Sequence, residues 1–231
     1  MMLFGEAPEF AILLSFLLVF SIVVYRRKAL DTEGILVADI LGLLTYLLGR
    51  ETEIGGFGAF AGLLFFFIIG EAATRMVQKK KTHEIRSTRN VIMNSTGPLL
   101  ALFLQSPAGF LGGLSAVLSD TVSSEIGPLD RRKPRMILGF KKVDHGTDGA
   151  VSTLGLVAGM MGAALMGLFA FILIPDYQLA FAITMGGIIG NLVDSVAGAV
   201  LQKNQTISNA EVNLLCGLSG ALAAVLVFSA W

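Results

Sequence analysis

The chain has 231 residues and a formal net charge of zero; 54% of its residues are hydrophobic and 15% are charged. A soluble domain carries roughly 25% charged residues, so this composition excludes a soluble globular domain and predicts an integral membrane protein. The single cysteine, Cys216, excludes an internal disulfide and a cysteine-based zinc site.

Eight apolar runs predict an all-α, polytopic transmembrane helix bundle that forms a single domain over residues 1–231. In chain order, the runs cover residues 9–25, 34–49, 54–76, 90–105, 107–122, 149–174, 177–201 and 210–230. The fourth and fifth are short and are interrupted by Pro98 and Pro107, so they are either short spans or broken, re-entrant helices. Irregular backbone at membrane depth needs protein or water to cover it, which makes this region a candidate site.

Basic residues are distributed very unequally between the two ends of these runs. Sixteen of the 17 lysines and arginines follow the first, third, fifth and seventh runs, and only Arg50 lies at the other end. Because lysine and arginine are retained in the cytoplasm, we expect both termini outside and cytoplasmic loops at about 77–89 and 123–148. The pattern predicts a cell-membrane protein whose active site faces the cytoplasm.

Ionisable side chains inside apolar runs are costly and are functional by default. The chain has four such residues: Asp39, Glu71, Asp120 and Asp194. Helical spacing in the seventh run gathers polar and small residues on one face: Asn191, Asp194, Ser195 and Gly198. This face predicts either a functional site or a hydrogen-bonded seam between helices.

The segment 119–127 (SDTVSSEIG) places two carboxylates and four hydroxyls at a membrane surface. Mg²⁺ prefers oxygen ligands and keeps some waters, so we predict a magnesium site formed by Asp120 and Glu125 with help from Asp194. The first two are five residues apart and diverge on a regular helix, so they serve one ion only if the helix ends between them. Otherwise each binds a separate ion, or the segment is simply a polar helix end that faces water.

A second polar region is the basic loop that begins at Arg131 and continues into the segment 144–149 (DHGTDG). Small and hydroxyl residues before a helix offer free backbone N–H groups to phosphate. Basic side chains such as Arg135 and Lys142 would neutralise the remaining charge. His145 is treated as an ordinary loop histidine.

The preceding loop carries Arg89, Asn90 and Asn94, of which the two asparagines share a helix face. Asn94 lies at membrane depth and needs a hydrogen-bond partner there. Three neighbouring lysines, Lys79, Lys80 and Lys81, are expected to contact anionic headgroups instead.

Together these residues resemble an integral membrane family catalogued as a domain of unknown function, whose plant members are phytyl-phosphate kinases. The resemblance spans most of residues 26–220 and is carried by RNVIMN (89–94), DTVSSEIG (120–127), Pro134-Arg135, Lys142 with GTDG (146–149), Ser152, Gly190, DSVAGA (194–199) and Asn213. It implies phosphoryl transfer from a nucleoside triphosphate, CTP in the plant case, to a polyprenyl monophosphate of the phytyl or geranylgeranyl type. With the magnesium site predicted above, the expected cofactor is Mg²⁺ and the co-substrate is CTP.

On these grounds we predict a membrane phosphotransferase with three sets of site residues. The catalytic set is Asp120, Glu125, Lys142 and Arg89, and the metal set is Asp120, Glu125 and Asp194. The substrate-binding set is Asn90, Asn94, Arg135, Gly146, Thr147, Asp148, Ser152, Asn191, Ser195 and Asn213. Phosphoryl transfer depends on positioning and charge neutralisation, which suits a site with no obvious nucleophile.

Two other functions compete with this interpretation. A membrane cytidylyltransferase that makes a CDP-lipid would use the same two substrates. A transporter for an anionic lipid or an ion would have Asp39, Glu71 and Asp194 along its path, but the polar residues crowd toward one membrane face, which favours an enzyme. The expected partners are the prenyl phosphate, the nucleotide and membrane lipids, with no nucleic acid; a homo-oligomer is compatible with the sequence.

Overall fold

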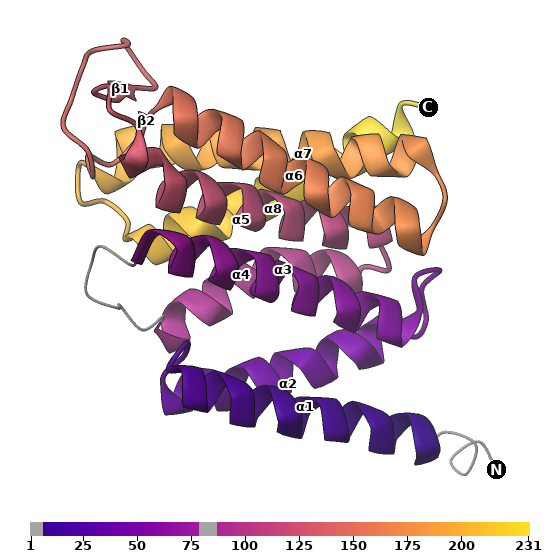
Figure 1. Ribbon diagram of the computed structural model, residues 1–231. Coiled ribbons are helices and arrows are strands. Elements are labelled where there is room, and N and C mark those ends of the chain that lie inside the picture. The colour runs from indigo at the N-terminus through magenta and orange to yellow at the C-terminus, as the bar shows by residue number, and fades with distance from the viewer. Residues whose placement is uncertain (1–6, 79–86) are drawn as a thin grey trace.

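The computed structural model describes residues 7–78 and 87–231, and these residues form a bundle of eight α-helices (Figure 1). The helices are α1 (Ala7–Arg27), α2 (Thr32–Gly49), α3 (Gly55–Gln78), α4 (Thr88–Phe103), α5 (Pro107–Ile126), α6 (Thr153–Leu173), α7 (Tyr177–Ala197) and α8 (Asn209–Ser229). A five-residue π-helical segment, Gly198–Gln202, extends α7. The predicted all-α membrane architecture is confirmed.

Six of the described helices are long and apolar enough to cross a membrane, namely α1, α2, α3, α6, α8 and α7 with its extension. The remaining two, α4 and α5, run side by side across the bundle in opposite directions (Figure 1). Both are unbroken, so the alternative of broken helices is wrong. Pro107 begins α5, where its missing N–H costs nothing, and Pro98 is accommodated inside α4 because its ring packs beside Gly113 and Gly217.

Helix α5 lies at the centre of the bundle and packs against α3, α4, α6, α7 and α8. Its apolar residues Leu111, Leu114 and Leu118 are fully buried. Small residues bring the surrounding helices close: a Cβ added to Gly220 of α8 would lie 2.3 Å from the Cβ of Ala116. Without a hydrophobic driving force between helices in lipid, such close backbone contact supplies the attraction.

The helices α1, α3, α5 and α7 finish at one end of the bundle, and α1 begins and α8 finishes at the other (Figure 1). We call the first the basic end, because the described lysines and arginines lie there, with the exception of Arg50, which lies after α2. The predicted grouping of basic residues on one side is therefore present in the fold. Most of the predicted 77–89 loop, with Lys79, Lys80 and Lys81, lies outside the described residues.

The long loop after α5 contains structure that the sequence did not predict. It begins with a 3-10 helix, η1 (Gly127–Leu129), and a two-stranded hairpin in which β1 (Arg135–Met136) pairs antiparallel with β2 (Ala150–Val151). Helix α6 begins at Thr153, not at residue 149, because Gly146 and Gly149 have positive φ angles that a helix excludes. Helix α5 continues to Ile126, beyond the expected end at 122, since no helix-breaking residue precedes Gly127-Pro128.

Candidate functional site

Asp120 of α5 and Asp194 of α7 face each other inside the bundle, with their carboxyl groups within hydrogen-bonding range. The Oδ1 atom of Asp194 is buried and has no hydrogen-bond partner among the described residues. Two carboxylates cannot remain charged side by side in a low-dielectric interior unless they share a proton or bind a cation. The pair therefore has the ligand chemistry of a cation site.

The acid pair is held by a hydrogen-bonded seam formed by residues that precede each acid in the chain, Ser119 on α5 and Asn191 on α7. Asn191 Nδ2 donates to Ser119 Oγ over 3.0 Å, and Ser119 Oγ donates to the carbonyl oxygen of Gly159 over 2.8 Å. Both side chains are buried, with 6% of Asn191 and none of Ser119 exposed. The seam fixes α7 and α6 against α5, so the structure supports the seam interpretation for Asn191. The neighbouring Ser195 is half-buried and makes no side-chain hydrogen bond among the described residues.

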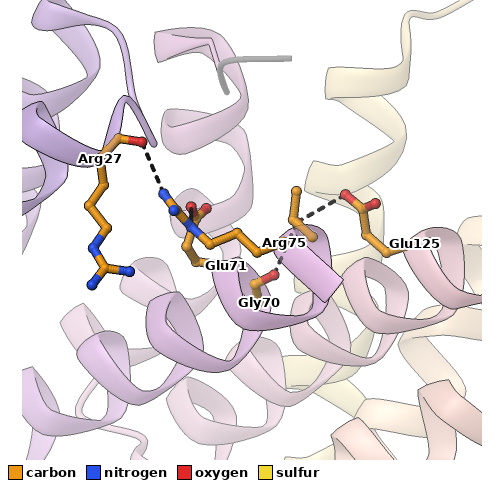
Figure 2. Close-up of polar contacts among 6 residues, drawn as sticks. Arg27, Gly70, Glu71, Arg75 and Glu125 are labelled. Atoms are coloured by element: carbon orange, nitrogen blue, oxygen red, sulfur yellow. Dashed lines mark hydrogen bonds and ion pairs between the residues drawn. The ribbon is translucent and has the colours of Figure 1, made fainter. Parts of the chain in front are cut away.

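Glu125 does not join this pair. Because α5 is unbroken, side chains five residues apart point about 140° apart around its axis. Thr74 of α3 donates to Glu125 Oε1 over 2.9 Å, and the same hydroxyl lies 3.0 Å from the carbonyl oxygen of Gly70 (Figure 2). Within residues 7–78 and 87–231, no three histidine, cysteine or acidic side chains gather into a metal-binding group. The predicted set of Asp120, Glu125 and Asp194 is thus brought together only in part.

A contact that the sequence analysis missed lies beside Glu125. Arg75 of α3 donates from Nε to Glu71 Oε1 over 2.6 Å and from Nη2 to the carbonyl oxygen of Arg27 over 3.0 Å (Figure 2). Arg27 is the last residue of α1, so the guanidinium satisfies a free carbonyl at that helix end. The i, i+4 spacing of Glu71 and Arg75 was the available signal for the first bond. These contacts attach α1 to α3 at the basic end.

Helices α4 and α8 add polar groups at the same end. They cross closely, since a Cβ added to Gly97 would lie 2.7 Å from the carbonyl carbon of Gly217. At about 1.5 Å per residue, Asn94 and Asn213 lie roughly 5–6 Å from this crossing toward the basic end. The Oδ1 atom of Asn94 is buried without a partner among the described residues, and Asn213 is half-buried.

Helix α8 also approaches the acid pair. Cys216, only 1% exposed, is close enough to interact electrostatically with both Asp194 and Asp120. Gly190, one turn before Asp194, allows this approach, because its added Cβ would lie 2.8 Å from the carbonyl oxygen of Cys216. The polar residues of α4, α5, α7 and α8 therefore occupy neighbouring positions near the basic end of the bundle.

Arg89 begins this polar region at the surface. It pairs with Glu211 of α8 over 3.5 Å, and both side chains are substantially exposed. Asn90, one residue further along α4, is half-buried beside a pocket between α1, α2, α3 and α4. The three predicted residues of α4 thus run inward from the surface, with Arg89 outermost and Asn94 deepest.

The hairpin loop covers the end of α7, one turn beyond Asp194. Gly149 packs on the backbone of Ala199, where an added Cβ would lie 2.3 Å from the Ala199 nitrogen. Gln202 Nε2 donates to Asp148 Oδ1 over 2.8 Å. The predicted residues Gly146, Thr147 and Asp148 therefore lie in the loop that directly precedes β2. The bond between Asp148 and Gln202 attaches this loop to the π-helical extension of α7.

Several charges of the hairpin are engaged with the loop itself. Arg135 Nη1 donates to the carbonyl oxygen of Phe140 over 3.1 Å, and the backbones of Arg135 and Lys142 form a bridge. Lys133 and Asp144 form an exposed ion pair of 2.8 Å, which raises the pKa of Lys133 and lowers that of Asp144 through the hydrogen bond and the charge of each partner. The side chains of Arg135 and Lys142 are exposed at the basic end.

At the start of the sixth helix, where a phosphate site is expected, two backbone N–H groups are bonded to side chains of the protein. Ser152 caps α6 by accepting from the N–H of Gly155 over 3.0 Å, and it donates to the carbonyl oxygen of Gly127 over 3.1 Å. Asp130 accepts from the N–H of Leu154, and its backbone hydrogen bonds lower its pKa. The N–H groups of Gly155 and Leu154 are therefore engaged within the protein, and Gly146 and Thr147 precede the helix by several residues.

Comparison with known proteins gives a consistent result. The model of the family described as "Integral membrane protein DUF92" matches residues 15–221. An uncharacterized membrane protein of Methanocaldococcus jannaschii is 36% identical over 222 residues, which cover 91% of this chain and 90% of that protein. No solved structure matches the chain significantly.

Two plant proteins are also similar. Protein VTE6, chloroplastic, of Arabidopsis thaliana is 31% identical over 224 residues, which cover 86% of this chain and 65% of the plant protein, slightly less than two thirds of its length. Protein PGR of the same plant is 27% identical over 234 residues, which cover 84% of this chain and 78% of that protein.

Proposed function

The chain belongs to the integral membrane DUF92 family, as its sequence resemblance predicted, and from this premise we propose that it is a prenyl-phosphate kinase. The reaction transfers the γ-phosphoryl group of CTP to a polyprenyl monophosphate of the phytyl or geranylgeranyl type. A monoester oxygen attacks the γ-phosphorus, the bond to the β–γ bridging oxygen breaks, and CDP leaves. The products are the prenyl diphosphate and CDP.

The observation that carries this proposal is the Asp120–Asp194 pair. Two facing carboxylates, one of them with a buried oxygen that lacks a partner, fit the oxygen ligands that Mg²⁺ takes together with waters and substrate phosphates. When bound there, magnesium would neutralise charge on the nucleotide phosphates. Glu125 lies on another face of α5, and we assign it to holding α5 against Thr74.

The remaining chemistry needs no strong base. A phosphate monoester is already largely ionised at pH 7, because its second pKa is about 6. Arg89, Arg135 and Lys142, which lie at the basic end, would bind the phosphates that magnesium does not reach. An arginine can hold phosphate through two parallel N–H bonds, whereas lysine acts as a point charge. We place this end in the cytoplasm, where CTP is available, on the retention of basic residues.

Product analysis tests the proposal and its nearest alternative. The purified protein in lipid nanodiscs would be incubated with geranylgeranyl monophosphate, magnesium and CTP labelled at either the α- or the γ-phosphate. A kinase transfers the γ label to the lipid and releases CDP. Transfer of the α label with release of pyrophosphate would instead identify a cytidylyltransferase, and transfer of neither label from any of a panel of nucleotides would contradict both enzymes.

The transporter alternative receives less support from the contacts of its three acidic residues. Asp39 accepts from Ser21 of α1 over 2.5 Å, Glu71 pairs with Arg75, and Asp194 faces Asp120. Each acid thus has a separate partner: that of Asp39 is on α1, that of Glu71 is on the same helix, α3, and that of Asp194 is on α5. An enzyme site at the membrane surface explains why Asp194 lies near the basic loop. A transport path through the whole membrane depth does not require this position.

A further inference from the structure

A pocket lies between α1, α2, α3 and α4, away from the acid pair. Its walls are apolar and rich in aromatic rings, including Phe20, Phe60 and Phe67, and the cavity volume is about 70 Å³ before the open space at its mouth is counted. Phe20 and Phe67 meet edge to face with ring centroids 5.1 Å apart. Phe60 and Phe67 are seven residues apart on α3, so this wall alone extends about 10 Å along the helix axis.

The pocket is polar at one end only. Asn90, Asn94 and Ser95 line it where α4 begins, at the basic end. The opposite end is apolar: Gly42 lines it with Phe60 and Leu17, whose side chains would lie 3.0 and 3.1 Å from a Cβ added to that glycine. A polar end near basic residues and an apolar far end match an amphiphile with a single apolar chain and an anionic head.

Asn94 links this pocket to the candidate catalytic site. On α4 it lies about 60° around the axis from Gly97, which packs on α8, and about 100° from Ser95, which lines the pocket. Its unpartnered Oδ1 atom is therefore between the pocket and the α8 side of α4. A buried amide oxygen without a partner is costly, and the head group of a ligand at this end of the pocket would supply the missing hydrogen bond.

We infer that this pocket binds the isoprenoid chain of the prenyl monophosphate, with the head at Asn90 and Asn94 and the chain directed toward Phe60. The inference rests on the proposed function and adds the place and direction of its lipid substrate. The narrow space and aromatic walls suit one methyl-branched chain, whereas a diacyl lipid would need room for two. The head group would then lie on the side of α4 that faces α8 and, beyond it, the Asp120–Asp194 pair.

Photocrosslinking tests where the chain binds, independently of turnover. A farnesyl-type monophosphate with a diazirine at its far end would be irradiated with the protein in nanodiscs, and the labelled peptides identified by mass. Ala38→Phe fills the pocket from α2, and Ile40→Phe is the matched control, since Ile40 is 56% exposed on the same helix and does not line the pocket. A second variant, Phe67→Ala, enlarges the pocket by removing an aromatic side chain from its wall. It tests the same inference if Ala38→Phe does not fold.

We expect the label on α1 to α4. The amount of label should fall about tenfold or more in Ala38→Phe and stay unchanged in Ile40→Phe. In Ala38→Phe the KM for the prenyl phosphate should rise, whereas the KM for CTP should not. In Phe67→Ala the preference should move toward longer chains. Label elsewhere with normal turnover would overturn the pocket and leave the kinase intact. Label in the pocket without phosphoryl transfer would retain the pocket and overturn the kinase. Equal competition by phosphatidic acid would overturn the assignment to an isoprenoid chain.

Discussion

Asp120 and Asp194 come from different helices, α5 and α7, and their carboxyl groups face each other next to the buried thiol of Cys216. Each carboxyl group alone would be an expensive residue inside a membrane protein. As a pair they make a site for a shared proton or a cation, and the rest of the polar region is arranged around them. The following predictions test what this arrangement does.

The first prediction concerns the acid pair. Asp120→Asn keeps the shape and a hydrogen bond to Asp194 but removes one charge, so the protein should fold and lose about 100-fold or more of its turnover. Glu125→Gln is the matched control on the same helix, because Glu125 bonds Thr74 and should lose less than about tenfold. Turnover at limiting magnesium would be measured for both. Wild-type turnover in Asp120→Asn, or an equal loss in both variants, would contradict the assignment.

The second prediction separates phosphate-binding arginines from basic residues that only set topology. Arg89→Lys and Arg135→Lys keep the charge but lose the two parallel N–H bonds, so kcat/KM should fall by about tenfold in each. Replacing Lys79, Lys80 and Lys81 together by Gln removes three charges and should have little effect, because exposed charges are screened by salt. If only the triple variant lost activity, the basic residues would act through membrane attraction.

The third prediction concerns orientation in the membrane. We expect the β1–β2 loop in the cytoplasm and both termini outside, since nearly all of the lysine and arginine residues that the structure describes lie at one end of the bundle. Single cysteines would be introduced at position 133 and at the C-terminal Trp231, in a Cys216→Ala background, and labelled with an impermeant reagent on intact cells. Only position 231 should react. Labelling of position 133 from outside would reverse the model.

The fourth prediction concerns the joint between α2 and α4. Asp31 caps α2 by accepting from the Gly34 N–H, and it also accepts from the Thr88 hydroxyl over 2.9 Å. The Thr88 hydroxyl and then the Gly34 N–H hold the pKa of Asp31 below its ordinary value of 3.8. Asp31→Ala should therefore destabilise the protein by about 1 kcal/mol at neutral pH.

The same bonds set how this effect depends on pH. A carboxyl with a lowered pKa in the folded state contributes stability above its ordinary pKa, and this contribution is lost as the pH falls through the lowered value. The melting temperatures of the wild type and Asp31→Ala should thus differ at pH 7 and converge below pH 3.8. Glu33→Ala, two residues further along the chain in the first turn of α2, is the control. A difference that persists unchanged in acid would show that the charge of Asp31 does not contribute.

Much of the fold followed from periodicity and composition. The apolar runs identified eight helices, and the distribution of lysine and arginine identified the end at which α1, α3, α5 and α7 finish. The motifs from Arg89 to Asn213 identified the family. The predicted end of α5 and the predicted start of α6 were wrong, because hydropathy marks where a helix leaves lipid. Gly127-Pro128 decides where α5 ends, and the Ser152 cap decides where α6 begins.

The composition of the site depended on tertiary structure. Helical spacing showed that Asp120 and Glu125 diverge if α5 is regular, but it could not tell which helix each would meet. Glycines and other small residues decide that by allowing particular backbones to touch, as Gly190 does beside Cys216, and a sequence with 27 glycines permits many such contacts. The sequence by itself therefore determined the membrane class, the one-sided charge and the family. Only the packed bundle decided that Asp120 meets Asp194, that Glu125 meets Thr74, and that Asn94 lines a pocket.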